Sequence, residues 1–206
     1  MNKALTDKGK EIFPELKRFG GFYLAGGTGL AMQIAHRVSV DFDLFCQDEI
    51  SSGFLKKVEK VFSAREVRVS VNNPDELTVF VDDVKITFLY YPFPIYSQYI
   101  EMAGVKIISP KYIAFTKAYS IGRRGSYKDY VDLYFLLKGG YVQLNDIIKE
   151  CPKIFGGNFS DRLFLEQLVY MDDIDEIEIK FLEIKVTKKD LETFFVNEVE
   201  EFSSTV

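Results

Sequence analysis

Apolar and polar positions alternate with a period of two in three segments of the first half of the chain, which predicts β-strands. These segments are 67–71, 77–81 and 84–89, and Asp82-Asp83 between the last two suits a hairpin turn. Further apolar runs predict additional short strands at 22–25, 38–45 and 105–108. The first half is therefore expected to contain a mixed β-sheet.

Helical spacing of apolar residues dominates elsewhere. Residues 6–19 predict a helix that Pro14 interrupts, and Ser51-Ser52 are expected to cap a helix over 53–64. In the second half, Ser109-Pro110 has the chemistry of a helix start and Gly139-Gly140 that of a helix stop. The remaining helices are expected at 28–36, 110–122, 128–137, from 145 onward and at 188–202.

These elements predict an α+β fold: a mixed sheet flanked by helices, followed by a helical C-terminal half. The expected division is an α/β core over 1–104 and a mainly helical region over 105–206 that packs on it. With 206 residues and 47% hydrophobic content, the chain is long and apolar enough to fold around a sizeable core.

Composition narrows the class of protein. No apolar run approaches the ~20 residues of a membrane span, and the N-terminus lacks the apolar core of a signal peptide. Cys46 and Cys151 form no spacing motif. We therefore expect a cytoplasmic protein. Its net charge of −5 argues against a generally basic nucleic-acid coat, although a lysine- and arginine-rich stretch runs from Lys106 to Lys128.

The segment Gly26-Gly27-Thr28 lies between an expected strand and an expected helix. Glycines let the backbone approach a ligand, and the N–H groups at a helix start attract anions such as phosphate. A glycine pair alone is weak evidence, because such pairs also mark ordinary turns. No Gly-Lys-Ser/Thr follows, so the segment is not a Walker A loop.

Asp41 and Asp43 lie two residues apart in an expected strand, so both side chains should share one face. Val40, Phe42 and Leu44 would then face the core. Two like charges on one face repel each other unless something offsets them, and a hard divalent cation does so through oxygen ligands. A solvated strand face, or pairing with Arg37, is the alternative.

These residues resemble the core of a known family. Gly26-Gly27-Thr28 followed by Arg37-x-Ser39-x-Asp41-x-Asp43 is similar to the AbiEii/AbiGii-type nucleotidyltransferases of the DNA polymerase β-like superfamily. The similarity is strongest over 22–45 and 109–138, and weaker after 140. It includes a strand segment at 84–92, a helix centred on Lys117, and Lys128-Asp129-x-x-Asp132-Leu-Tyr.

The resemblance implies an enzyme that moves a nucleoside monophosphate, or a short tract, from an NTP to an acceptor. Mg²⁺ or Mn²⁺ would be held by Asp41 and Asp43. The implied acceptor is tRNA, with a protein or a small molecule as equal alternatives. The implied biology is a toxin with an antitoxin protein partner or a phage-defence system. The glycine turn, with Thr28 as an added donor, would hold phosphates.

The resemblance also gives roles to residues outside the metal pair. Lys117 would neutralise phosphate charge, and Asp132 would orient Lys117 or a ribose hydroxyl. Arg37, Ser39 and Asp129 would support nucleotide binding. Each has a structural alternative: Arg37 in a surface ion pair, Lys117 with its ammonium reaching solvent, and Asp129 as an acid in the first turn of a helix.

One departure from the family pattern concerns a third carboxylate that many active polymerase β-like enzymes carry on a later strand. The corresponding position here is Thr87, a neutral residue that is not a base at neutral pH. Asp82 and Asp83 are expected at a hairpin tip, too far along the strand. A binding protein without turnover is therefore the second hypothesis.

A dinucleotide-binding Rossmann fold is a third hypothesis. Gly27-x-Gly29 follows an expected strand, and acidic residues lie near the position of the usual ribose-binding acid. Met32 occupies the place of the third glycine, however, and the later strands alternate as hairpins.

Overall fold

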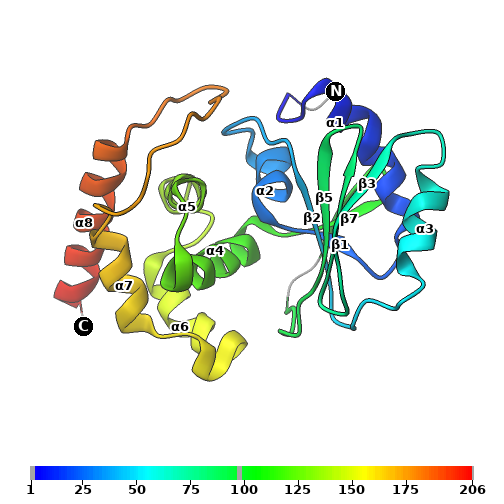
Figure 1. Cartoon of the computed structure of the whole chain (residues 1–206). Helices are drawn as coiled ribbons and strands as arrows, with labels where there is room; N and C mark the ends of the chain where they lie inside the picture. The colour runs from blue at the N-terminus through cyan, green and yellow to red at the C-terminus, as the bar shows by residue number, and fades with distance from the viewer. Residues whose placement is uncertain (1–2, 97–98, 206) are drawn as a thin grey trace. The chain divides into compact units, whose positions relative to one another are not determined.

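The computed structural model describes residues 3–96 and 99–205, and its contacts divide the chain into two units, Met1–Ser109 and Pro110–Val206. The boundary lies five residues beyond the one expected from the sequence. The first unit contains the sheet and the second is helical (Figure 1). The α+β fold class is confirmed.

The first unit begins with α1 (Asp7–Ile12) and the 3₁₀ helix η1 (Phe13–Arg18), in which Pro14 occupies the first turn. Helices α2 (Gly26–Ile34) and α3 (Phe54–Val61) follow in the same unit. The strands are β1 (Tyr23–Leu24), β2 (Phe42–Cys46), β3 (Val67–Asn72), β4 (Glu76–Val81), β5 (Val84–Tyr90), β6 (Tyr99–Met102) and β7 (Val105–Ile108).

All seven strands belong to one mixed sheet in the order β3-β4-β5-β2-β1-β7-β6. Strand β2 pairs with β5 in parallel and with β1 in antiparallel orientation. The Rossmann hypothesis is therefore wrong, because a Rossmann unit requires the strand after the glycine-containing helix to run parallel to the strand before it.

One face of the sheet carries the core of this unit. Leu44 of β2 and Phe88 of β5 belong to it, and the Phe88 ring lies 4.9 Å from the centroids of both Phe19 and Phe54. Helices α1 and α3 lie along the sheet (Figure 1) and contribute Ile12 and other apolar residues to this cluster. Alternation along each strand consequently directs Asp43 and Thr87 toward the opposite face.

Several details differ from the sequence-based expectations. Strand β2 begins at Phe42 instead of residue 38, so Val40 precedes the strand and is 46% exposed instead of facing the core. Ser39 forms only an isolated bridge with Leu5. Gly53 caps α3 without a side-chain hydrogen bond, in place of the expected serines. The hairpin at Asp82-Asp83 is confirmed, with φ values of 47° and 69°.

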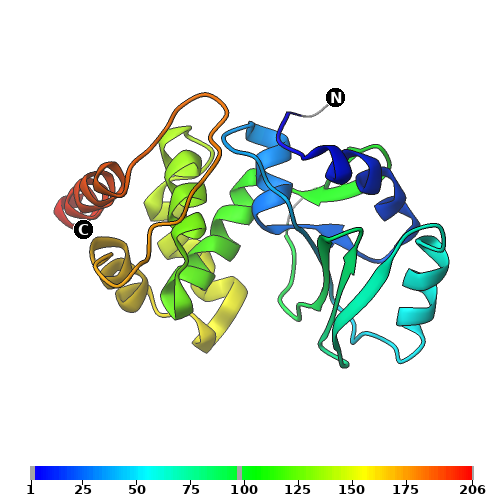
Figure 2. The same cartoon turned by 45° about the horizontal axis from the view of Figure 1, so that its top comes forward.

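The second unit consists of helices. They are α4 (Pro110–Arg124), α5 (Tyr127–Lys138), α6 (Leu144–Phe155), the 3₁₀ helix η2 (Gly156–Asn158), α7 (Asp161–Val169) and α8 (Lys188–Thr205). Figure 2 shows α4 among its neighbours α5, α6 and α7, against which it packs. The expected start at Pro110 and stop at Gly139-Gly140 are confirmed. Within the described residues, no helix is long and apolar enough to cross a membrane.

Candidate active site

The start of α2 lies against Asp43. The helix begins at Gly26 itself, so the glycines form its first turn instead of preceding it. Gly26 has a φ of +59°, and a Cβ atom there would collide with the Asp43 carboxylate. The Ala25 N–H donates to the Asp43 carbonyl at 2.9 Å, which fixes the helix start to β2. The conformation and the packing both require glycine at position 26.

Asp43 and Asp41 occupy different local environments. Asp43 is the second residue of β2 and faces away from the core, whereas Asp41 lies just before the strand. Both are half-buried. The start of α2, which is the positive end of the helix dipole, lies beside the Asp43 carboxylate.

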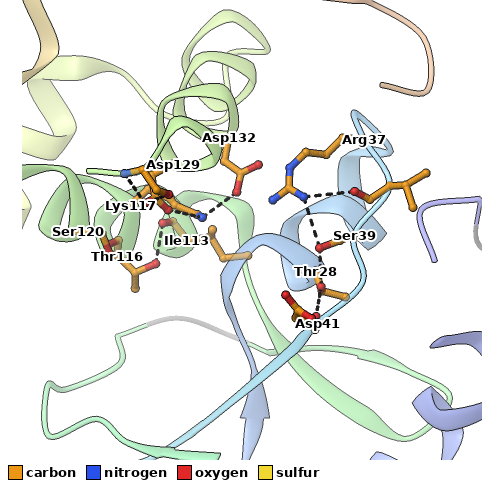
Figure 3. Close-up of polar contacts among 12 residues, drawn as sticks. Thr28, Arg37, Ser39, Asp41, Ile113, Thr116, Lys117, Ser120, Asp129 and Asp132 are labelled. Carbon is orange, nitrogen blue, oxygen red and sulfur yellow. Dashed lines mark hydrogen bonds and ion pairs between the residues drawn. The ribbon is translucent and has the colours of Figure 1, made fainter. Parts of the chain in front are cut away.

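A network of buried polar side chains fixes the segment that leads to Asp41 (Figure 3). The Thr28 hydroxyl donates to the Asp41 carbonyl, and its oxygen lies 2.7 Å from Ser39 Oγ. Arg37 donates from Nη1 to the Val38 carbonyl at 3.3 Å and to Ser39 Oγ at 3.4 Å. Thr28 is 1% exposed and Arg37 3%, so both side chains brace this segment from within the protein.

Strand pairing places Thr87 directly beside Asp43. The two residues are Cα partners in the parallel β2–β5 ladder. The position that the sequence analysis matched to the third carboxylate of the family therefore lies on the strand next to Asp43. The two other nearby acids, Asp82 and Asp83, are instead held at the hairpin by Arg65 at 2.7 Å and Arg68 at 2.9 Å. The hydrogen bond from Arg65 is the main reason that the pKa of Asp82 is lowered.

A second polar cluster lies in the helical unit (Figure 3). Lys117 of α4 places its Nζ 2.8 Å from Asp129 Oδ1 and 2.7 Å from Asp132 Oδ2, both on α5. The Lys117 side chain is 9% exposed and that of Asp132 is fully buried. The ammonium is thus held between two carboxylates and does not reach out to solvent, which was the structural alternative for Lys117.

Asp129 also caps the start of α5. Its Oδ2 accepts from the Ser126 N–H at 3.1 Å and from the Ser126 hydroxyl at 2.6 Å, which completes a capping box. Burial acts to raise the pKa of Asp129, but the charge of Lys117 and hydrogen bonds from Lys117 and Ser126 together lower it below its ordinary value. Asp129 therefore caps the start of α5, which was its structural alternative, and also binds Lys117.

The carboxylates of the first unit suit a hard cation. Within the described part of the chain, no three His, Cys, Asp or Glu side chains form a metal-binding group. Mg²⁺ needs only one or two protein carboxylates when substrate phosphates and water complete its shell. The feature that fits such an ion is the absence of a side chain at position 26, which leaves the Asp43 carboxylate uncovered beside the start of α2.

The basic stretch identified in the sequence is largely occupied by internal contacts. Lys111 pairs with Asp146 at 3.0 Å, and the Arg123 guanidinium lies 5.1 Å from the Tyr119 ring centroid. His36, the one histidine of the sequence, is buried at 4% exposure near the end of α2.

Comparison with known proteins identifies the family. The model of the family described as "Nucleotidyl transferase AbiEii toxin, Type IV TA system" matches residues 11–202. The chain belongs to the AbiEii nucleotidyltransferase toxin family. The chain is also similar to protein aq_aa25 of Aquifex aeolicus (strain VF5), with 32% identity over 183 residues, or 88% of this chain and 87% of the relative.

Two solved structures share the fold with this AbiEii-family chain. The nucleotidyltransferase toxin MenT4 of Mycobacterium tuberculosis H37Rv superposes with a TM-score of 0.63 at 14% identity, covering 93% of this chain and 80% of MenT4. JHP933 of Helicobacter pylori gives a TM-score of 0.56 at 17% identity, covering 98% and 96%. The resemblance stated from the sequence is confirmed, and the AbiEii family implies an NTP substrate.

Three residues that contact candidate site residues, directly or through Thr78, were absent from the sequence-based prediction: Ser126, Thr78 and Glu76. Ser126, which holds Asp129, had a recognisable signal in the Ser-x-x-Asp spacing before an apolar helix. Thr78 and Glu76 of β4 had none, because their relation to Thr87 depends on strand pairing.

Proposed function

We propose that this protein transfers a nucleoside monophosphate, or a short tract, from an NTP to an RNA acceptor in an Mg²⁺- or Mn²⁺-dependent reaction. The preferred acceptor is tRNA, and the protein is proposed to act as a toxin restrained by an antitoxin protein. The observation that supports this most directly is the close approach of Gly26, at the start of α2, to the Asp43 carboxylate.

Asp41 and Asp43 are the proposed metal ligands. When bound, the ion would supply positive charge to the triphosphate oxygens and to the leaving pyrophosphate. The N–H groups of Gly26 and Gly27 in the first turn of α2 are proposed to bind phosphate oxygens, which the helix dipole favours. Thr28, Arg37 and Ser39 hold the Asp41 segment through their mutual hydrogen bonds.

Lys117 is proposed to provide a fixed positive charge for the nucleotide. Its two carboxylate partners, Asp129 and Asp132, restrict the ammonium to one position, so little side-chain entropy remains to be lost on binding. Charge held in advance of the reaction stabilises the transition state better than charge that must reorganise.

The decisive experiment incubates the protein with each α-³²P-labelled NTP, Mg²⁺ or Mn²⁺, and total RNA. We expect label on RNA from the wild type, loss of label with EDTA, and loss in Asp41→Ala/Asp43→Ala. Asp48→Asn, which changes an exposed carboxylate just beyond β2, serves as the matched control and should retain activity. Label on the protein itself would identify a protein acceptor.

The second candidate is a nucleotide-binding protein without turnover, and Thr87 beside Asp43 is the observation that favours it. NTP binding by calorimetry, together with no label on RNA or protein under any metal, would establish this candidate. Labelling that survives in Asp41→Ala/Asp43→Ala would instead rule out the proposed metal ligands.

A further inference from the structure

A row of polar side chains crosses the open face of the sheet in the first unit. Asp43 on β2 is the register partner of Thr87 on β5, and Thr87 is the register partner of Thr78 on β4. Their flanking residues on each strand, such as Leu44, Phe88 and Val79, belong to the core on the other face. The row therefore lies on one face across three adjacent strands, which are about 4.8 Å apart.

The row ends in a carboxylate. Glu76 lies two residues before Thr78 on β4, so both side chains share the open face. The Thr78 hydroxyl oxygen lies 2.6 Å from Glu76 Oε1 and 3.3 Å from Thr87 Oγ1. Thr78 is 2% exposed and Thr87 8%, so both hydroxyls are shielded from bulk water.

The single proton of each hydroxyl sets the direction of these bonds. A hydroxyl donates one hydrogen bond, and an ionised carboxylate is the stronger acceptor, so Thr78 donates to Glu76. The Thr87 hydroxyl then donates to Thr78, which leaves lone pairs on the Thr87 oxygen. A threonine at this position consequently offers a hydrogen-bond acceptor beside Asp43.

We propose that Glu76, acting through Thr78 and Thr87, takes the place of the third carboxylate that this chain lacks at position 87. The inference rests on the proposed nucleotidyl transfer. Because Glu76 acts through two hydroxyls, it is a positioning residue for that reaction and also the final proton acceptor.

The acceptor hydroxyl loses its proton to Thr87 Oγ1 while its oxygen forms a bond to the α-phosphorus. The Thr87 proton moves to Thr78 Oγ1, and the Thr78 proton moves to Glu76 Oε1, which becomes neutral. The bond between the α-phosphorus and the bridging oxygen breaks, and pyrophosphate leaves with the electron pair. Each hydroxyl ends with one proton, as it began.

The test measures single-turnover label transfer to RNA by the full chain at saturating Mg²⁺ and over a range of NTP concentrations up to saturation. Glu76→Gln and Thr78→Val should lower the rate at least tenfold without changing the KM for NTP, whereas Thr78→Ser, which keeps the hydroxyl, should stay within about twofold. Asp75→Asn, an exposed neighbouring carboxylate, is the matched control and should match the wild type.

A rescue separates proton transfer from a structural role. Thr87→Asp supplies a carboxylate directly, so adding Glu76→Gln to it should cost little activity, although Glu76→Gln alone costs at least tenfold. The rate plotted against the D₂O fraction should curve for the wild type, because several protons move, and should be linear for Thr87→Asp.

Three outcomes overturn the inference and can be told apart. An active wild type whose Glu76→Gln and Thr78→Val variants keep its rate would exclude the relay and leave the proposed nucleotidyl transfer intact. A wild type that transfers no label, although it binds NTP, would exclude both. A Glu76→Gln loss that Thr87→Asp does not rescue would also exclude the relay.

Discussion

At the scale of single residues, Gly26 has two independent reasons to be glycine. Its φ of +59° disfavours any side chain, and a Cβ would collide with the Asp43 carboxylate. Gly140 shares the first property, with a φ of +69°, but a Cβ there would meet nothing within 4 Å. Alanine substitutions at the two positions therefore distinguish the effect of backbone strain, which both share, from the effect of a side chain beside the proposed metal ligand Asp43, which only position 26 has.

Gly26→Ala should abolish label transfer, whereas Gly140→Ala should leave it unchanged. Gly140→Ala should lose roughly 1–2 kcal/mol of stability, because alanine is strained in the left-handed conformation, and Gly26→Ala should lose more, because its Cβ also collides with Asp43. Denaturant unfolding and the RNA-labelling assay measure the two effects. Wild-type activity in both variants would show that the absence of a side chain beside Asp43 is not needed for the reaction.

Lys117 is predicted to be the most costly lysine to replace in α4. Lys117→Met leaves the buried Asp132 and the half-buried Asp129 without a cation, and breaking a buried pair in this way costs about 3–5 kcal/mol. Lys111→Met removes a half-exposed pair with Asp146 on the same helix, worth ~0–1 kcal/mol. Urea unfolding of both variants at pH 7 tests this prediction, and similar losses would contradict it.

At the scale of elements, the first turn of α5 links a helix cap to the Lys117 cluster. The Ser126 hydroxyl donates to the same Asp129 carboxylate that binds Lys117. Asp129 has a lowered pKa in the folded state, so its contribution to stability is present above its unfolded pKa of about 4 and is lost as the pH falls through the folded value.

Ser126→Ala should lower stability by about 1 kcal/mol at pH 7, the usual cost of losing an N-cap side chain. It should also raise the pKa of Asp129, because one of the hydrogen bonds that lowers it is removed. The part of the stability loss that Asp129 causes on acidification should therefore still begin near its unfolded pKa of about 4, but should be smaller and complete at a higher pH than in the wild type. Unfolding curves between pH 2.5 and 6 test this, with Ser160→Ala, the cap of α7, as the control.

Elements whose boundaries depend on local chemistry were predictable from the sequence. Pro110 starts α4 and Gly139-Gly140 ends α5, because proline and glycine act within one turn of chain. Strand β6 was missed because its residues form a strand only through pairing with β7. The Lys117–Asp132 contact was expected as one role for Asp132, whereas Glu76 was not, since its place beside Thr78 and Thr87 requires the sheet register.

At the scale of the whole molecule, family membership and local geometry support different parts of the functional argument. The family match over residues 11–202 assigns a nucleotidyltransferase toxin family. The side chains of each unit supply the residues that we propose for the chemistry: the carboxylates near α2 in the first, and the Lys117 cluster in the second.

Toxicity in cells should depend on the same carboxylates as label transfer. Induced expression of the wild type is expected to arrest bacterial growth, because nucleotides added to tRNA would block its use in translation. Asp43→Asn should grow normally at equal protein level, and Asp48→Asn should arrest growth like the wild type. Growth curves, taken with labelling of RNA from the same cells, make the comparison. Arrest by Asp43→Asn would show that toxicity arises from binding a cellular partner instead of from nucleotidyl transfer.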